Sequence, residues 1–166
     1  VIVARLSAIE ELAGMTVLCS DKTGTLTQNK LSLRDPLLMG DMNEEELVFY
    51  AALSAKRAEG NQDAIDFCIT QAVTNRSKLA SFKEVKFVPF NPTDKRTEAT
   101  VQAPDGSVFK VTKGAPQVIL RLAHNYTELQ SRVEGAVQDL ADRGFRALGV
   151  AISYTDEDAP PRWEFQ

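Results

Sequence analysis

The hydrophobic period of the chain changes near residue 82, and this change restricts the folds that the sequence can form. Upstream of it, apolar residues recur mostly at helical spacing. Downstream, residues 84–88, 97–103 and 108–113 alternate apolar with polar side chains, which is typical of half-buried strands. A Pro-Asp-Gly turn at 104–106 joins the second of these segments to the third. We therefore expect an antiparallel meander.

Helical patterns lie on both sides of the meander. They cover residues 4–13, 41–57, 63–72, 116–124 and 127–144. Asn43 followed by Glu46 is a capping-box pattern, which favours a helix start. Ser7 is a candidate cap of the first helix and Thr127 of the last, and Gly144 is placed to end the last one.

Two further strands are expected outside the meander. Thr16–Ser20 is a short apolar run that favours a buried strand, and residues 145–153 alternate larger with smaller side chains. Residues 154–163 are acidic and contain prolines, so we expect a loop or linker there. Helices around a largely antiparallel sheet define an α/β fold of the α+β-like kind.

Composition limits the classes of function. The 166 residues are 43% hydrophobic and 25% charged, which is enough for one sizeable core. Acidic and basic residues are interspersed at a net charge of −4, which argues against a nucleic-acid or anionic-membrane partner. The sequence has no run of about 18 apolar residues, so we expect a soluble domain. Cys19 and Cys68 lack metal-ligand spacing and indicate a reducing cytosolic setting.

The stretch Val17–Leu31 puts one carboxylate, Asp21, directly after the first expected strand. Such a residue points into the crevice where open α/β sheets bind ligands. Small, hydroxylated and basic residues follow it, which suits a phosphate group. A carboxylate that attacks a phosphoryl group forms an acyl phosphate, and the attack needs a neutralising cation such as Mg²⁺. From these residues alone, Asp21 is either a turn residue or a nucleophile.

The string DKTGTLT, residues 21–27, resembles the phosphorylation motif of the P-type ATPases. NQDAID, PFNPTDKRT, KGAP and PPRWEF extend the resemblance over nearly the whole chain, to the plasma-membrane proton-pumping (type III) branch. In that family a nucleotide-binding domain is inserted into a haloacid-dehalogenase-like Rossmann phosphorylation domain. The resemblance implies that residues 1–33 lead the phosphorylation domain, that 34–153 form the nucleotide-binding domain, and that 154–166 are the linker returning to the phosphorylation domain.

The resemblance also implies the chemistry of the Asp21 loop. Asp21 is then the phosphorylated nucleophile, Lys22 belongs to the same catalytic group, and Thr23 offers its carbonyl to Mg²⁺ and its hydroxyl to the phosphoryl group. Asp21 and Thr23 would share the Mg²⁺ with ligands from outside this chain. Haloacid-dehalogenase phosphatases carry a second aspartate, a general acid–base, where this chain has Thr23. A pump is therefore favoured over a free-standing phosphatase, which stays the alternative.

A nucleotide pocket is expected around FVPFNPTDKRT, residues 87–97. Phe90 is the candidate to stack on adenine, because aromatic rings bind nucleobases through their faces. Lys95 resembles the pocket lysine of the family. From the residues alone, the favoured interpretation is that Phe90 closes the core end of a strand and that Lys95 with Arg96 forms a solvated turn.

Five further pocket residues follow from the resemblance. Lys113 and Gly114 of KGAP correspond to the family's nucleotide pocket, and Arg146 resembles an arginine that reaches the phosphates. Asp63 or Asp66 matches an acidic residue close to adenine. From the residues alone, the two carboxylates complement a helix dipole. In the same way, Lys113 and Gly114 form an ordinary strand-to-helix connection, and Arg146 is a strand residue facing water.

These patterns together predict an ATP-binding cytosolic fragment of a P-type ATPase, with ATP and Mg²⁺ as its ligands. The full-length, multi-pass pump would export protons, or another cation, across the plasma membrane through an aspartyl phosphate. The expected partners are its remaining phosphorylation, actuator and transmembrane domains. The fragment itself is expected to bind ATP with little or no turnover. A non-enzymatic interaction domain is the other alternative.

Overall fold

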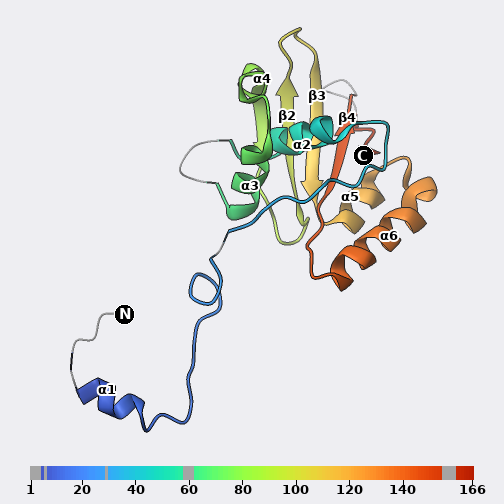
Figure 1. Cartoon of the computed structure of the whole chain (residues 1–166). Coiled ribbons are helices and arrows are strands. Elements are labelled where there is room, and N and C mark those ends of the chain that lie inside the picture. Colours follow the sequence, from blue (N-terminus) through green and yellow to red (C-terminus); the bar gives the residue numbers. More distant parts are fainter. Residues whose placement is uncertain (1–4, 6, 29, 58–61, 155–159) are drawn as a thin grey trace. The chain divides into compact units, whose positions relative to one another are not determined.

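The computed structural model describes residues 5, 7–28, 30–57, 62–154 and 160–166 (Figure 1). The chain divides into two compact units, residues 1–30 and 31–166, and each is described by itself. The domain boundaries expected at residues 33 and 153 stay predictions.

The first unit contains helix α1 (Ser7–Leu12) and the loop around Asp21. Helix α1 begins at Ser7, so Ser7 is a helical residue and not the cap. The strand predicted over Thr16–Ser20 is wrong, because these residues are irregular and Val17 is 73% exposed. A strand needs a neighbour for its backbone N–H and C=O groups, and the described residues offer none at this place.

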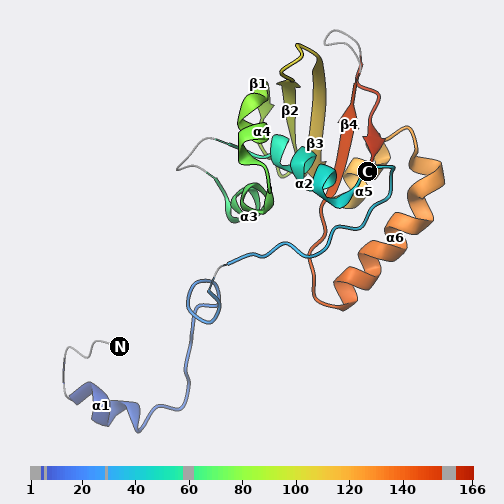
Figure 2. The same cartoon turned by 45° about the horizontal axis from the view of Figure 1, so that its top comes forward.

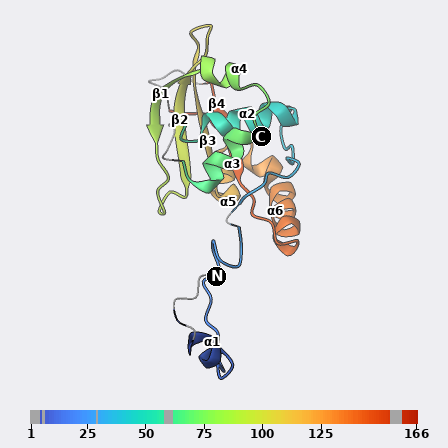
Figure 3. The same ribbon diagram turned by 60° about the vertical axis from the view of Figure 1, so that its left-hand side comes forward.

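The second unit is built on a five-stranded antiparallel sheet, in the order β1-β2-β3-β4-β5. The strands are β1 (Lys83–Val88), β2 (Arg96–Gln102), β3 (Val108–Gly114), β4 (Gly149–Ser153) and β5 (Glu164–Phe165). The predicted meander and the α/β fold class are confirmed. Figure 3 shows β1 at one edge of this sheet.

Helices cover the sheet, and most were predicted. They are α2 (Glu44–Leu53), α3 (Ala64–Ala72), α4 (Arg76–Ser81), α5 (Pro116–Leu122) and α6 (Tyr126–Asp142). The capping box is confirmed: Asn43 Oδ1 accepts from Glu46 N at 2.9 Å, and Glu46 Oε2 accepts from Asn43 N at 3.1 Å. Helix α4 was missed because its six residues are too few to show a helical period.

The C-terminal end of α6 is a Schellman motif. Gly144 has a φ of +79° and donates its N–H to Ala141 O, while Phe145 N–H reaches Leu140 O at 2.8 Å. The predicted stop at Gly144 is therefore confirmed. The predicted cap at Thr127 is wrong, because the helix already begins at Tyr126.

Strand β4 is shorter than expected and does not alternate in burial. The pattern predicted a strand over residues 145–153, but only Gly149–Ser153 pair, and all five residues are buried. Strands β3 and β5 flank it, so it lies inside the sheet and both of its faces are covered. The segment 145–148 stays irregular and leads from α6 to the sheet. Strand β5 was not predicted, since two residues carry no period.

Two hydrophobic cores lie on opposite faces of the sheet. The first contains residues of α2, α3, β2 and β3, with α2 lying across the strands (Figure 1 and Figure 2). The second contains residues of α5, α6 and β5. Because successive strand residues face opposite sides, Val150 and Ile152 join the first core and Ala151 joins the second. Strand β4 therefore connects both layers.

Gly114→Ala is expected to lower the free energy of unfolding by about 1–3 kcal/mol, the usual cost of overpacking. A Cβ here would lie 2.7 Å from Cα of Arg96 and would also meet the Lys95 carbonyl oxygen. Urea denaturation of the chain measures the change. Gly135→Ala is the matched control, because Gly135 lies in α6 with nothing within 4 Å of its Cβ position. It should gain about 0.5–1 kcal/mol; equal effects would contradict the close approach at Gly114.

Candidate functional site

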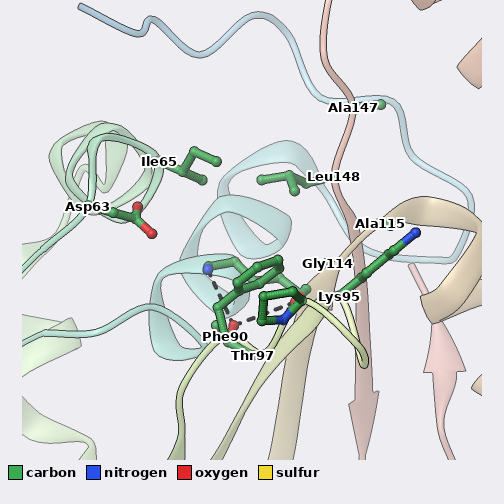
Figure 4. A pocket seen from close by; sticks show the side chains of 11 residues that line it. Asp63, Ile65, Phe90, Lys95, Thr97, Gly114, Ala115, Ala147 and Leu148 are labelled. Atoms are coloured by element: carbon green, nitrogen blue, oxygen red, sulfur yellow. Dashed lines mark hydrogen bonds between the residues drawn. The ribbon is translucent and has the colours of Figure 1, made fainter. Parts of the chain in front are cut away.

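A cavity of about 390 Å³ opens in the second unit, among α3, the turn before β2 and the segment before β4 (Figure 4). Its volume is in the range of about 300–1,000 Å³ that is usual for ligand pockets. Its lining residues are Asp63, Ile65, Phe90, Pro92, Lys95, Thr97, Lys113, Gly114, Ala115, Ala147 and Leu148. Several predicted site residues, chosen from separate motifs, therefore lie around one cavity: Asp63, Phe90, Lys95, Lys113 and Gly114.

The turn that carries Lys95 is held in an unusual backbone conformation. Among the described residues, Lys95 is the one non-glycine with a positive φ, +50°. Its N–H donates to Asn91 O at 2.7 Å, and its carbonyl accepts from Ala115 N at 3.0 Å. Gly114 leaves the room for this approach, since a Cβ there would collide with the turn. Such strain costs roughly 1–3 kcal/mol and is concentrated at functional sites.

A buried ion pair lies behind the cavity wall. Lys113 Nζ is 2.6 Å from Asp66 Oδ1, and both side chains are almost fully buried. Asp66 Oδ2 accepts from Lys56 N at 2.8 Å, and Lys113 Nζ donates to Thr97 Oγ1 at 3.3 Å. The charge of Lys113 is thus matched inside the protein. This arrangement ties α3 to β3.

The two candidate carboxylates have different surroundings. Asp63 is exposed, lines the cavity and caps α3 by accepting from Asp66 N at 2.8 Å. Asp66 is 4% exposed and faces Lys113 rather than the open cavity. Of the two, Asp63 is the one that a ligand in the cavity can reach, whereas Asp66 contacts Lys113.

Apolar side chains form much of the cavity wall. Ile65 projects from α3 and Leu148 from the segment before β4, on either side of the space above Phe90 (Figure 4). Phe90 is 57% exposed, so its ring does not close the core as the alternative interpretation required. An exposed aromatic face between aliphatic walls suits a flat, partly apolar ligand.

Arg146 is exposed and does not line the cavity, although the next two residues do. The motifs also did not single out Ile65, Thr97, Ala115, Ala147 and Leu148, which together with Pro92 complete the lining. Ile65 and Leu148 had only their apolar character as a signal, and core residues carry the same signal. Their place at the cavity depends on tertiary packing.

The loop around Asp21 lies in the first unit. Gly24 has a φ of +84°, and the N–H groups of Leu26 and Thr27 both donate to Lys22 O at 3.0 Å. These bonds close a tight turn over residues 22–27, directly after Asp21, and Asp21, Lys22 and Thr23 are all exposed. Asp21 and Thr23 supply oxygen ligands of the type Mg²⁺ prefers, but two residues are fewer than the roughly six positions it fills. Their fit to Mg²⁺ is therefore partial.

A second hollow, about 940 Å³ in volume, lies between α3, α4 and the start of β1. Both of its lining arginines already have partners: Arg57 donates to Leu79 O at 3.1 Å and to Phe82 O at 2.8 Å, and Arg76 donates to Gln71 Oε1. Burial lowers the pKa of Arg57, and Glu84 partly opposes this effect. The arginine therefore anchors α4. Its bonds are already made within the protein, so the first cavity is the better candidate site.

No family model matches the chain, but curated relatives match nearly all of it. It is 48% identical to a probable plasma membrane ATPase of Dictyostelium discoideum over 99% of its length. It is 44% identical to a plasma membrane ATPase of Dunaliella bioculata over 98%, and 45% identical to a putative cation-transporting ATPase of Methanocaldococcus jannaschii over 99%. The chain is therefore homologous to one segment of the P-type plasma-membrane ATPases, which confirms the resemblance of its motifs.

The chain spans only 15–20% of the length of these three relatives. Among the residues that the structure describes, no helix combines the length and the apolar character needed to cross a membrane.

Asp66→Asn is expected to lower the free energy of unfolding by about 3–5 kcal/mol, because it leaves the buried Lys113 ammonium without its counter-charge. Denaturant titration measures the loss. Asp139→Asn is the matched control, since Asp139 pairs with Arg143 at 3.2 Å on the exposed surface and should contribute at most about 1 kcal/mol. A combined Asp66→Leu and Lys113→Met variant should recover much of the stability. Equal losses for Asp66→Asn and Asp139→Asn would contradict a buried pair.

Proposed function

We propose that the chain binds ATP in the cavity beside Phe90, as the nucleotide-binding part of a cation-transporting P-type ATPase. The supporting observation is convergence. Residues from three separate motifs, NQDAID, PFNPTDKRT and KGAP, line one ligand-sized cavity although the sequence separates them widely. If these segments were only solvated turns and ordinary connections, as the alternative interpretations state, their residues would have no reason to line the same cavity.

The apolar half of the cavity is the proposed adenine site. Adenine would stack on the exposed face of Phe90, between Ile65 and Leu148. Asp63 lies on the α3 side of the cavity and retains acceptor capacity beyond its helix-capping bond, which suits the exocyclic amine of adenine. Lys113 is neutralised by Asp66, so we assign it to this half rather than to the phosphates.

The opposite side is the proposed phosphate site. Figure 4 shows Asp63 on one side of the cavity and Lys95 on the other. The side chain of Lys95 extends away from Asp63, towards Ala115. Among the described ion pairs, none involves Lys95, so its charge is available to an anion. Gly114 allows the Lys95 turn to pack closely at this side, and Arg146, which is exposed and directly precedes the lining residue Ala147, is the proposed second cation.

In the complete protein, we propose that ATP bound here transfers its γ-phosphoryl group to Asp21. The bond from the β–γ bridging oxygen to phosphorus breaks, a carboxylate oxygen of Asp21 takes the phosphoryl group, and ADP leaves. Lys22 and the Thr23 hydroxyl would stabilise the charge on the transferred group. Mg²⁺, held by Asp21, Thr23 and residues outside this chain, supplies further neutralisation when bound. We propose that this phosphoryl transfer drives proton export across the plasma membrane, and that this chain lies on the cytoplasmic face of that membrane.

Phe90→Ala is expected to weaken adenosine and ATP binding by roughly five- to 150-fold, the loss of about 1–3 kcal/mol of stacking. Calorimetric titration of the chain with each ligand measures it. Phe67→Ala is the matched control, because Phe67 is 54% exposed, close to the 57% of Phe90, and lies outside the cavity. Lys95→Gln should weaken ATP more than adenosine, since adenosine has no phosphate. Unchanged binding in Phe90→Ala would contradict the site, and no binding to the unsubstituted chain would favour an interaction domain.

The isolated chain is expected to bind ATP with little or no turnover, because Asp21 and Thr23 provide only part of a Mg²⁺ coordination sphere. Asp21→Asn should therefore leave ATP affinity within about twofold, which is less than 0.5 kcal/mol. A phosphate-release assay and acid-quenched labelling with γ-phosphate-labelled ATP are the measurements. Steady hydrolysis, or a stable aspartyl phosphate on the fragment, would contradict this expectation.

A further inference from the structure

Two arginines contact the aromatic ring of Phe145, which lies two residues before the cavity-lining Ala147. Cζ of Arg34 lies 5.7 Å from the centroid of Phe145, and Cζ of Arg143 lies 5.2 Å from it. Both distances are within the roughly 6 Å at which a guanidinium is attracted to an aromatic face. Arg143 follows α6 directly, whereas Arg34 comes from the beginning of the second unit. The ring thus connects two segments that the sequence separates widely.

Phe145 connects the end of α6 to the segment that forms one wall of the cavity. Its N–H donates to Leu140 O in the motif that ends α6. The segment 146–148 that follows has no regular secondary structure, and Ala147 and Leu148 line the cavity. The direction in which this segment leaves Phe145 therefore decides where Arg146 and the cavity wall lie.

The charges around Phe145 are unbalanced. Arg143 has a partner in Asp139 at 3.2 Å. Arg34 and Arg146 take part in none of the ion pairs between described residues. A guanidinium that stacks through its face keeps its edge N–H groups free for hydrogen bonds. Arg34 and Arg146, which have no ion-pair partner among the described residues, would gain from a nearby anion.

We propose that Arg34 is a positioning residue of the nucleotide site. Through its contact with Phe145, it holds the 146–148 segment in the arrangement that brings Arg146 to the phosphates and Leu148 to the base. The proposal rests on ATP binding in the cavity. It adds a residue that lies outside every motif that pointed to the site. The competing interpretation is that Phe145 makes only the hydrophobic contact that often accompanies a Schellman motif, in which case Arg34 has no effect on binding.

The first experiment needs no nucleotide. Arg34→Gln should shift the backbone amide resonances of Arg146, Ala147 and Leu148 in the NMR spectrum of the free chain. Arg121→Gln is the matched control, because Arg121 is exposed on α5 and its loss changes the net charge equally. Unshifted resonances in Arg34→Gln, or equal shifts in Arg121→Gln, would overturn the positioning role.

The second experiment measures ATP and adenosine affinity by calorimetry. Arg34→Gln should weaken ATP about two- to fivefold, as expected when an exposed cation–π contact no longer favours the binding-competent arrangement. Arg34→Lys should restore most of the affinity, because lysine also binds an aromatic face. Phe145→Leu should reproduce the loss, and combining it with Arg34→Gln should add little further.

Three affinity results would also overturn the proposal: ATP affinity unchanged in Arg34→Gln, no rescue by Arg34→Lys, or losses in Arg34→Gln and Phe145→Leu that simply add. A failure of the proposed function looks different, because the unsubstituted chain would then bind neither adenosine nor ATP. In that case the amide shifts still report whether Arg34 holds the segment, and the role in nucleotide binding is rejected.

Discussion

The candidate site depends on one buried carboxylate. Asp66 pairs with Lys113 of β3, accepts from the Lys56 backbone, and starts α3 through the bond from its own N–H to Asp63. Three segments therefore meet at one side chain, from which water is nearly excluded. An uncompensated charge in such a place is strongly destabilising, so each segment is held to its position by the others. Asp63 and Ile65 line the cavity because α3 is fixed in this way.

The other side of the cavity is fixed by backbone sterics rather than by charge. Lys95 keeps a positive φ because the Asn91 carbonyl, the Ala115 N–H and the close approach of Gly114 leave it no other arrangement. The backbone of such a turn is fixed before a ligand binds, and Lys95 takes part in none of the ion pairs between described residues. Preorganisation of this kind reduces the ordering cost of binding an anion, and it explains why a strained residue persists in a fold of marginal stability.

Local signals in the sequence predicted much of the fold. The capping box at Asn43, the Gly144 stop and the period-two meander each follow from a few neighbouring residues, and the structure has all three. Features that depend on distant partners were missed. Strand β5 has two residues and exists because β4 lies beside it, while the strand expected at Thr16–Ser20 has no described neighbour. The motifs identified the polar residues of the candidate site. They could not identify Ile65 and Leu148, because in the sequence these two apolar residues look the same as residues of the hydrophobic core.

The pairing of Asp66 with Lys113 also sets the polarity of the cavity. Two lysines line it, yet Lys113 is neutralised by a carboxylate 2.6 Å away, so the positive charge that the lining offers to a ligand is that of Lys95. Asp63 stands on the opposite side from Lys95 (Figure 4). A ligand with a polyanionic end and an amine-bearing, flat end therefore meets complementary charge in only one orientation. Had both lysines been unpaired, the field would have been nearly uniform, and the apolar walls by themselves would not have distinguished the two ends of the ligand.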